Sequence, residues 1–220
     1  MRFFLLYLLL FMMSGCTVLS VQPTTSDPVH RYFLNIALGS EFGSHHSNIK
    51  KWNQPIYIQV KGLPTKKDVD TLKQVMSELS DLTRLSIKMV TTEPANINVY
   101  FVPKSQFSEI EPNYKHGNSG FFWVWWHPLT NNIYQARILI STTTLSQIER
   151  NHLIYEELTQ SLGLMKDSRR YSDSIFYQSW SRVTRFSDMD KKIIQLLYHR
   201  AINSGMNREE VIEVLEGMFF

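Results

Sequence analysis

Apolar residues recur with two different periods along the chain, and the change of period predicts where strands and helices lie. Residues 55–62 (PIYIQVKG), 87–91 (IKMVT) and 97–102 (INVYFV) are short β-rich runs that predict strands. Residues 66–85 instead place apolar side chains on one helical face: Val69, Leu72, Val75, Met76, Leu79 and Leu82. A helix between two strands indicates a crossover connection and some parallel pairing.

The middle of the chain predicts two more strands followed by a long helix. Residues 120–128 (GFFWVWWHP) and 133–142 (IYQARILIST) are strand-like and are joined by the turn PLTNN. Thr144 is expected to open the next helix, whose apolar spacing of threes and fours runs to Leu162. Gly163 is placed to end that helix.

Shorter helices are expected on either side of this region. Residues 30–42 (HRYFLNIALGSEF) predict a short amphipathic helix with Gly39 as its stop. Ser187 is expected to cap a helix, with Asp190 three residues later in a capping-box arrangement, and Asn207 or its neighbour begins the last helix. The pattern as a whole predicts one α+β domain with a mixed, twisted sheet of about five strands and C-terminal helices.

The first sixteen residues, MRFFLLYLLLFMMSGC, are expected to be a targeting segment. One arginine precedes an apolar run from Phe3 to Met13 that is too short to span a membrane and fits a signal peptide. Its ending, Met-Ser-Gly-Cys, resembles the bacterial lipobox, which implies cleavage before Cys16 and lipidation of that residue. Cys16 is the only cysteine, so the alternatives are a reactive thiol or an intermolecular disulfide. The expected organisation is a signal peptide at 1–15, lipidated Cys16 and a tether at 16–29, and one domain at 30–220.

Charge and the residue after the cysteine bear on partners and location. The formal net charge is +3, and no dense Lys/Arg stripe occurs in the sequence, which argues against a nucleic-acid partner. Residue 17 is threonine rather than aspartate, which in a proteobacterium favours the outer membrane, facing the periplasm. The expected partners are the membrane, through a lipid anchor, and an envelope protein or peptide.

The stretch EELTQSLGLMK at 156–166 carries the chemistry that the sequence suggests. It resembles the HExxHxxGxxH signature of the metzincin zinc proteases, a likeness that extends over residues 50–200. The resemblance places Glu156, Gln160 and Lys166 at the three ligand positions, Glu157 at the general-base position and Gly163 at the turn. It also resembles an exported bacterial family of unknown function that shares E-E-x-x-Q-x-L-G-L.

Two later segments strengthen the metzincin resemblance. Ser174, Phe176 and Tyr177 lie in SIFY, which is similar to the Met-turn with phenylalanine in place of methionine. FSDMDKKIIQLLYH, at 186–199, is similar to the helix that follows the Met-turn in matrixins and serralysins. The resemblance implies a metzincin-like fold around a degenerate zinc motif.

The three ligand positions predict that zinc does not bind there, so no cofactor is expected. A carboxylate is a zinc ligand, but an amide oxygen is a poor one, and a protonated lysine repels the ion. Because a buried carboxylate needs a partner, one hypothesis is that the Lys166 ammonium replaces the metal, held by Glu156 or Glu157 with Gln160 alongside.

Several residues have two open interpretations. His152, Glu156 and Gln160 lie at successive helical turns and would present one nitrogen and two oxygens to a metal, unless the histidine is simply packed. The pair at 45–46, two histidines, is either a surface loop or an adventitious metal site. Trp123, Trp125 and Trp126 either form a platform for a peptide or a sugar ring, on the strand where metzincins receive substrate, or belong to the core.

Two main functions remain open from the sequence. The first is a lipid-anchored envelope protein whose degenerate protease domain binds a peptide or protein, or assists assembly, without catalysis. The second is an active hydrolase that uses Glu157 as general base with a non-standard metal site or none. A structural lipoprotein whose cleft has no role is a third possibility, because a fold does not fix a function.

Overall fold

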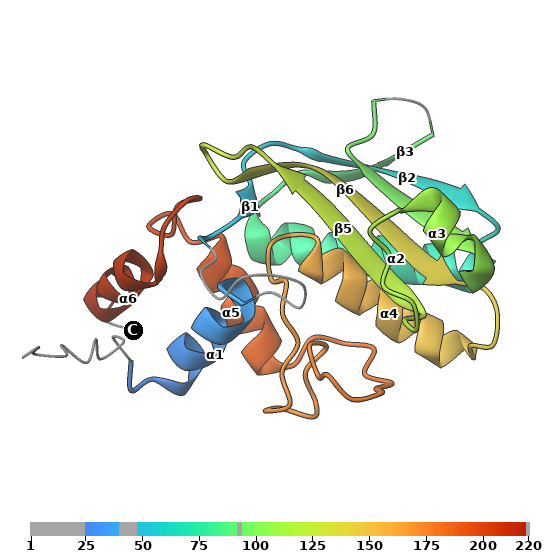
Figure 1. Ribbon diagram of the computed structural model, residues 1–220. Coiled ribbons are helices and arrows are strands. Elements are labelled where there is room, and N and C mark those ends of the chain that lie inside the picture. The colour runs from blue at the N-terminus through green and yellow to red at the C-terminus, as the bar shows by residue number, and fades with distance from the viewer. Residues whose placement is uncertain (1–24, 40–47, 92–93, 219–220) are drawn as a thin grey trace, which may run out of the picture.

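The computed structural model describes residues 25–39, 48–91 and 94–218. These residues form one mixed sheet with helices beneath it (Figure 1). The strands are β1 (Lys51–Trp52), β2 (Ile56–Gly62), β3 (Ile87–Val90), β4 (Ile97–Val102), β5 (Gly120–Trp126) and β6 (Asn132–Ser141). The helices are α1 (Pro28–Ala37), α2 (Lys66–Thr83), the 3-10 turn η1 (Lys104–Gln106), α3 (Phe107–Ile110), α4 (Gln147–Gln160), α5 (Asp188–Leu197) and α6 (Arg208–Gly217). The predicted α+β class is confirmed, with six strands rather than five.

The sheet is mostly parallel, and the parallel pairing that the crossover connection predicted is confirmed. Strands β3, β2, β4 and β6 lie side by side and parallel, and β1 pairs in parallel with the beginning of β6. Strand β5 pairs with β6 in the antiparallel direction, with Gly120 opposite Ile140 and Val124 opposite Ala136. The sequence missed β1, which has two residues, and the short η1–α3 segment, because neither is long enough to show a period.

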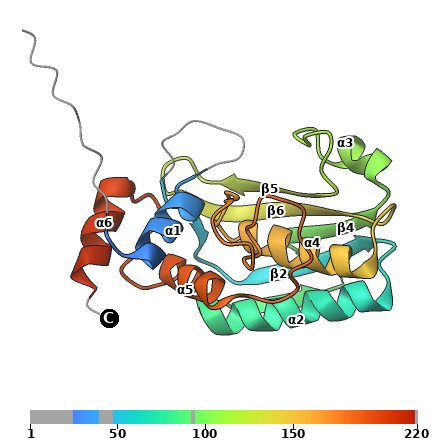
Figure 2. The ribbon, with the colours of Figure 1, turned by 90° about the horizontal axis from the view of Figure 1, so that it is seen from below.

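The two faces of the sheet have different surroundings. Inner-face side chains such as Ile58, Val99 and Ile138 are fully buried in the main core, where α2 and α4 run beneath the strands (Figure 2). On the outer face, Phe107 of α3 covers one end by packing with Phe121 and Leu139. The inner face therefore positions α4, the helix that carries the protease-like motif.

The ends of α4 differ from the prediction. The helix is capped by Ser146 rather than opened by Thr144, because the Ser146 and Glu149 side chains bond reciprocally to each other's backbone. It ends at Gln160, three residues before Gly163. Gly163 has φ +119°, and a Cβ there would lie 2.0 Å from the Lys50 carbonyl oxygen. Glycine is required at this point for the close approach of two chain segments as well as for the turn.

The remaining expected helices are present. Helix α1 is capped by Asp27, ends before Gly39 and packs mainly on α5. Capping boxes begin α5 at Ser187 with Asp190, and α6 at Asn207, as predicted. The leader with Cys16 and the histidine pair at 45–46 lie outside the described residues. Within the described part of the chain, no helix has both the length and the apolar character needed to cross a membrane.

Candidate functional site

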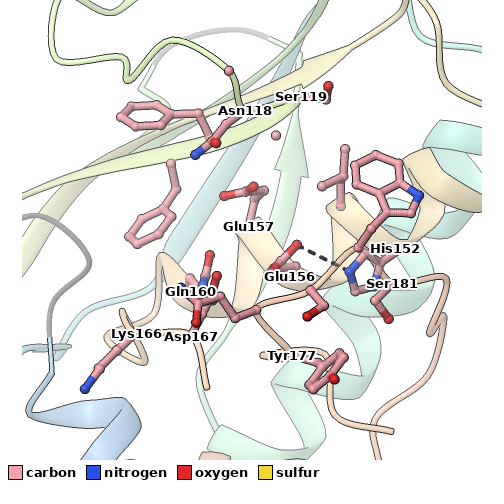
Figure 3. Close-up of a pocket in the computed structure, with 18 residues that line it drawn as sticks. Asn118, Ser119, His152, Glu156, Glu157, Gln160, Lys166, Asp167, Tyr177 and Ser181 are labelled. Atoms are coloured by element: carbon pink, nitrogen blue, oxygen red, sulfur yellow. Dashed lines mark hydrogen bonds and ion pairs between the residues drawn. The ribbon is translucent and has the colours of Figure 1, made fainter. Parts of the chain in front are cut away.

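A cleft of about 640 Å³ lies between the beginning of β5 and helix α4 (Figure 3). Residues 117–122 form one wall, and residues 177–181 form the opposite side together with Lys166 and Asp167. The α4 side chains that face the cleft lie at the spacing of successive helical turns: His152, Leu153, Glu156, Glu157 and Gln160. The cleft thus contains the general-base position and all three ligand positions of the protease-like motif.

Glu157 lies at the inner end of the cleft against strand β5. Its side chain is 6% exposed, and a Cβ on Gly120 would meet Glu157 Oε1 at 2.3 Å. Any larger residue at position 120 would therefore displace this carboxylate. The absent side chain of Gly120 is what lets Glu157 reach the backbone of β5.

His152 is packed and bonded rather than pointed at open solvent. Its Nδ1 lies 2.7 Å from the Val183 carbonyl oxygen, which makes Nδ1 the protonated nitrogen of the neutral ring. Its Nε2 lies 3.4 Å from Glu156 Oε2. Burial lowers the pKa of His152, while the Val183 carbonyl raises it to a smaller extent. His152 is thus a packed side chain, 4% exposed, whose orientation is set by the backbone bond of Nδ1.

The two other ligand positions have partners of their own. Gln160 Nε2 donates to Asp167 Oδ1 at 2.6 Å, across the turn that contains Gly163. Lys166 Nζ donates to Asn35 Oδ1 of α1 at 3.0 Å. Figure 3 shows Lys166 turned toward α1, away from Glu156 and Glu157. The hypothesis of a Lys166–glutamate pair in place of the metal was wrong, because the fold brings α1 to this lysine.

These residues do not fit a zinc ion. A protonated lysine cannot ligate, and Gln160 offers a neutral amide whose nitrogen is already bonded to Asp167. Among the residues that the structure describes, no three His, Cys, Asp or Glu side chains lie in an arrangement that could hold a metal. The donor set beside Glu157 therefore differs in kind from that of a zinc protease.

The segment that resembles the Met-turn is bonded to α1 and α5. Ser174 Oγ donates to Asp190 Oδ1 at 2.5 Å and accepts from the Phe176 backbone N–H at 3.1 Å. The Tyr32 hydroxyl of α1 lies 2.9 Å from Ser174 Oγ. Phe176 is fully buried, whereas Tyr177 lines the cleft. We call Tyr32, Ser174 and Asp190 the support cluster.

The tryptophans of β5 lie away from the cleft. Trp123 packs in the small outer-face cluster with Phe121, and the Arg137 guanidinium lies 5.4 Å from the centroid of the Trp125 ring. Trp126 follows a bulge in the strand and is 37% exposed. None of the three lines the cleft; the sequence identified an aromatic strand but left open whether it forms a binding platform or part of the core.

Sequence reasoning missed the segment that forms the far rim of the cleft. Trp180 lines the cleft and is 62% exposed, yet its Nε1 donates to Glu149 Oε1 at 3.3 Å. Arg182 donates to the same oxygen at 2.9 Å. Bonds from Ser146, and then from Arg182, lower the pKa of Glu149 to about 2. The sequence does show a carboxylate, Glu149, at the first turn of a predicted helix. It does not show that Arg182, some thirty residues later, bonds to it.

Comparison with known proteins identifies the family of this chain. A family model described as a protein of unknown function, DUF2927, matches residues 26–217. The chain belongs to this family. Among solved structures, the DUF2927 chain is similar to two of myroilysin, a metalloprotease. The first has a TM-score of 0.45 and 15% identity, and covers 69% of this chain and 83% of that one.

The second myroilysin structure is similar to this chain to about the same degree. Its TM-score is 0.47 at 12% identity, and it covers 69% of the DUF2927 chain and 86% of its own. No curated protein matches this chain. At this level of similarity, the likeness to myroilysin assigns neither an activity nor a residue role.

Proposed function

We propose that this DUF2927 chain is a non-catalytic module of the bacterial cell envelope that binds an extended peptide segment of a partner in the cleft between β5 and α4. A lipid on Cys16 would anchor it to the membrane, with residues 17–29 as a tether, in the outer membrane facing the periplasm. A myristoyl-length chain alone binds membranes weakly, whereas the several chains implied by a lipobox anchor a protein stably.

The edge of β5 is the observation that carries the peptide proposal. Of the strands in the described part of the chain, only β6 pairs with β5. The Ser141 N–H donates to the Ser119 carbonyl, so the odd-numbered residues of β5 direct their backbone groups toward β6. The backbone groups of Gly120 and Phe122 therefore point the other way, along the cleft. An extended peptide adds to such an edge as a further strand.

The side chains around Glu157 favour binding over hydrolysis. The ligand positions engage Asp167 and Asn35, so they hold the walls of the cleft in place. Glu157 at the base position has no Lewis acid among these donors to activate a water molecule. A hydrolase that uses Glu157 would need a different means of activation, and this makes catalysis the second candidate.

Peptide selection from a random library would test the proposal, with the full chain held in detergent. Ser179 is exposed at the rim of the cleft, so Ser179→Trp would obstruct it. Ser108→Trp, at an exposed position on α3, is the matched control. We expect selected peptides to lose at least tenfold in affinity for Ser179→Trp and to bind Ser108→Trp as they bind the parent chain. Equal binding by both variants would place the peptide elsewhere.

Metal content and turnover separate the two candidate functions. We expect elemental mass spectrometry of the full chain to find no stoichiometric metal. Added zinc, manganese or calcium should leave the melting temperature unchanged, because specific binding to the native state would raise it. Cleavage of a bound peptide that Glu157→Gln abolishes, in a variant that still folds, would establish the hydrolase instead.

The anchor has its own measurement. Labelled palmitate should be incorporated into the parent chain and not into a Cys16→Ser variant when both are expressed in a bacterial host. A mature protein that retains residues 1–15 would contradict both the cleavage and the lipid.

A further inference from the structure

The outer face of the sheet carries a transverse row of side chains that lies apart from the cleft. The strand registers place Val90, Gln59, Asn98, Arg137 and Trp123 beside one another on β3, β2, β4, β6 and β5. Their neighbours along each strand point to the opposite face, into the core. The row thus crosses five strands on the face that α2 and α4 do not cover (Figures 1 and 2).

Two acceptors in the middle of this row lack a donor. Gln59 Oε1 and Asn98 Oδ1 are buried without a hydrogen-bond partner. The Gln59 amide is oriented by its Nε2, which donates to the Thr91 carbonyl at 3.1 Å. Buried acceptors without donors destabilise a protein, so adjacent examples call for an explanation. The Asn98 side chain as a whole is only half-buried, and rotation of its amide would bring the oxygen to a ligand that carries hydroxyl donors.

The strands themselves add only positive charge to this face. None of the six strands contains an aspartate or a glutamate. The outward-facing strand residues include three cations, Lys61, Lys88 and Arg137, of which Arg137 pairs with Glu111 at 2.9 Å. Lys61 and Lys88 add positive charge on either side of the row, next to Tyr100 and Tyr57 in the strand registers. This charge is complementary to an anion.

Aromatic rings border the same row. Trp123 and Trp125 lie at its β5 end, and Tyr100 and Tyr57 lie on the strands within it, all half-buried. Lys61 Nζ lies 5.5 Å from the Tyr100 ring centroid, so a cation and an aromatic surface are presented together. A sugar ring has an apolar C–H face that packs on such rings, and hydroxyl groups around its edge.

We propose that the outer face of the sheet, centred on the row from Val90 to Trp123, binds a carboxylate-bearing glycan. Sugar hydroxyls donate to Asn98 when its amide is turned outward, the sugar carboxylates lie against Lys61 and Lys88, and the sugar faces pack on the half-buried rings. This site is independent of the peptide cleft. Single-stranded nucleic acid also uses aromatic and basic surfaces, but it needs a groove of cations along its backbone, whereas this row is centred on amide acceptors.

Calorimetry on the full chain in detergent tests the site, with three probes: hexamannuronate as the acidic sugar, maltohexaose as the neutral sugar and a short oligothymidylate. We expect hexamannuronate to bind most tightly, and the affinity to fall as salt rises. The double change Lys61→Glu and Lys88→Glu should weaken that binding at least fivefold. The matched control is Lys67→Glu with Lys73→Glu, at exposed positions on α2, and it should leave the affinity unchanged.

The outcomes that overturn the proposal are distinct. Absence of hexamannuronate binding removes the site, and an equal loss in the α2 control shows unspecific attraction by charge. Maltohexaose binding as tight as hexamannuronate removes the role of the lysines. Tighter binding of oligothymidylate replaces the glycan with a nucleic acid.

Asn98→Ala distinguishes a ligand contact from a structural role. Because it removes an acceptor that has no donor, we expect the melting temperature to stay the same or rise. Hexamannuronate affinity should nevertheless fall at least threefold. A lower melting temperature with unchanged affinity would show that Asn98 serves the fold and would contradict the proposed contact.

Discussion

The support cluster and the three ligand positions of the motif have opposite surroundings. In the support cluster of Tyr32, Ser174 and Asp190, the Ser174 hydroxyl both donates and accepts within the core. At the ligand positions, side chains reach sideways to partners on the cleft wall, as Lys166 does to Asn35. The contrast teaches that neighbouring parts of one motif can serve different ends: one part lies in a buried hydrogen-bond cluster, and the other forms contacts of the cleft wall.

Burial makes the support cluster depend on its own hydrogen bonds. Burial raises the pKa of Asp190, although bonds from Ser174 and Ser187 oppose the rise. A carboxyl group in this position is stable only with its donors in place. Glu156 and Lys166 in the cleft are only half-buried, so exchange of one polar partner for another costs less at these two positions.

The largest expected effect is on Asp190, because it joins three segments. Asp190 accepts from Ser174 Oγ and from the Ile175 and Ser187 backbone N–H groups. Asp190→Ala leaves these donors buried without an acceptor and removes the cap of α5. We expect a loss of about 3–5 kcal/mol in the free energy of unfolding, measured with urea. Asp188→Ala, exposed on the same first turn, should cost about 0.5 kcal/mol; similar losses for both would contradict a special role of the cluster.

Alanine substitutions at Gly163 and Gly117 would distinguish the cost of a steric contact from the cost of backbone strain. Their φ angles are +119° and +115°, but an added Cβ meets the Lys50 carbonyl at 2.0 Å in one case and nothing within 4 Å in the other. Gly117→Ala should cost roughly 1–2 kcal/mol of stability through strain alone. Gly163→Ala should cost roughly 2–4 kcal/mol, since Lys50 must also move. Equal melting temperatures for the two variants would show that the contact with Lys50 is unimportant.

His152 predicts how stability depends on pH. Because its pKa is lowered in the folded state, the unfolded chain binds the proton more readily below about pH 6.5. Stability should therefore rise with pH between the lowered pKa and about 6.5, with a slope of at most about 1.4 kcal/mol per pH unit from this group. His152→Gln should flatten the urea midpoint over that window. The same substitution at exposed His127 is the control, and an unchanged slope in His152→Gln would assign the dependence to other groups.

The smallest expected effect on stability is that of substituting Lys166. This substitution tests whether the partner of Lys166 is Asn35 or Glu157. Lys166→Met removes one hydrogen bond to Asn35 and should cost about 1 kcal/mol. In double-mutant cycles, Lys166 should couple with Asn35 by about 0.5–1 kcal/mol and with Glu157 by about zero. Strong coupling to Glu157 would restore the hypothesis in which an ammonium group replaces the metal.

The sequence alone determined the elements with a clear local signal. Periodicity located α2 and five strands, and the serine and asparagine caps located the starts of α5 and α6, because capping is a contact within one turn. The spacing of Glu156, Glu157 and Gln160 also fixed which side chains face the cleft together. These predictions depend on residues a few positions apart.

The tertiary structure alone decided the partners. Lys166 bonds to a residue 131 positions earlier, Gly163 approaches Lys50, and none of the β5 tryptophans lines the cleft. A strand pattern shows that side chains alternate but not which face meets which layer. Contacts between distant segments exist only once the sheet and helices have packed, so the local pattern of this chain could not specify them.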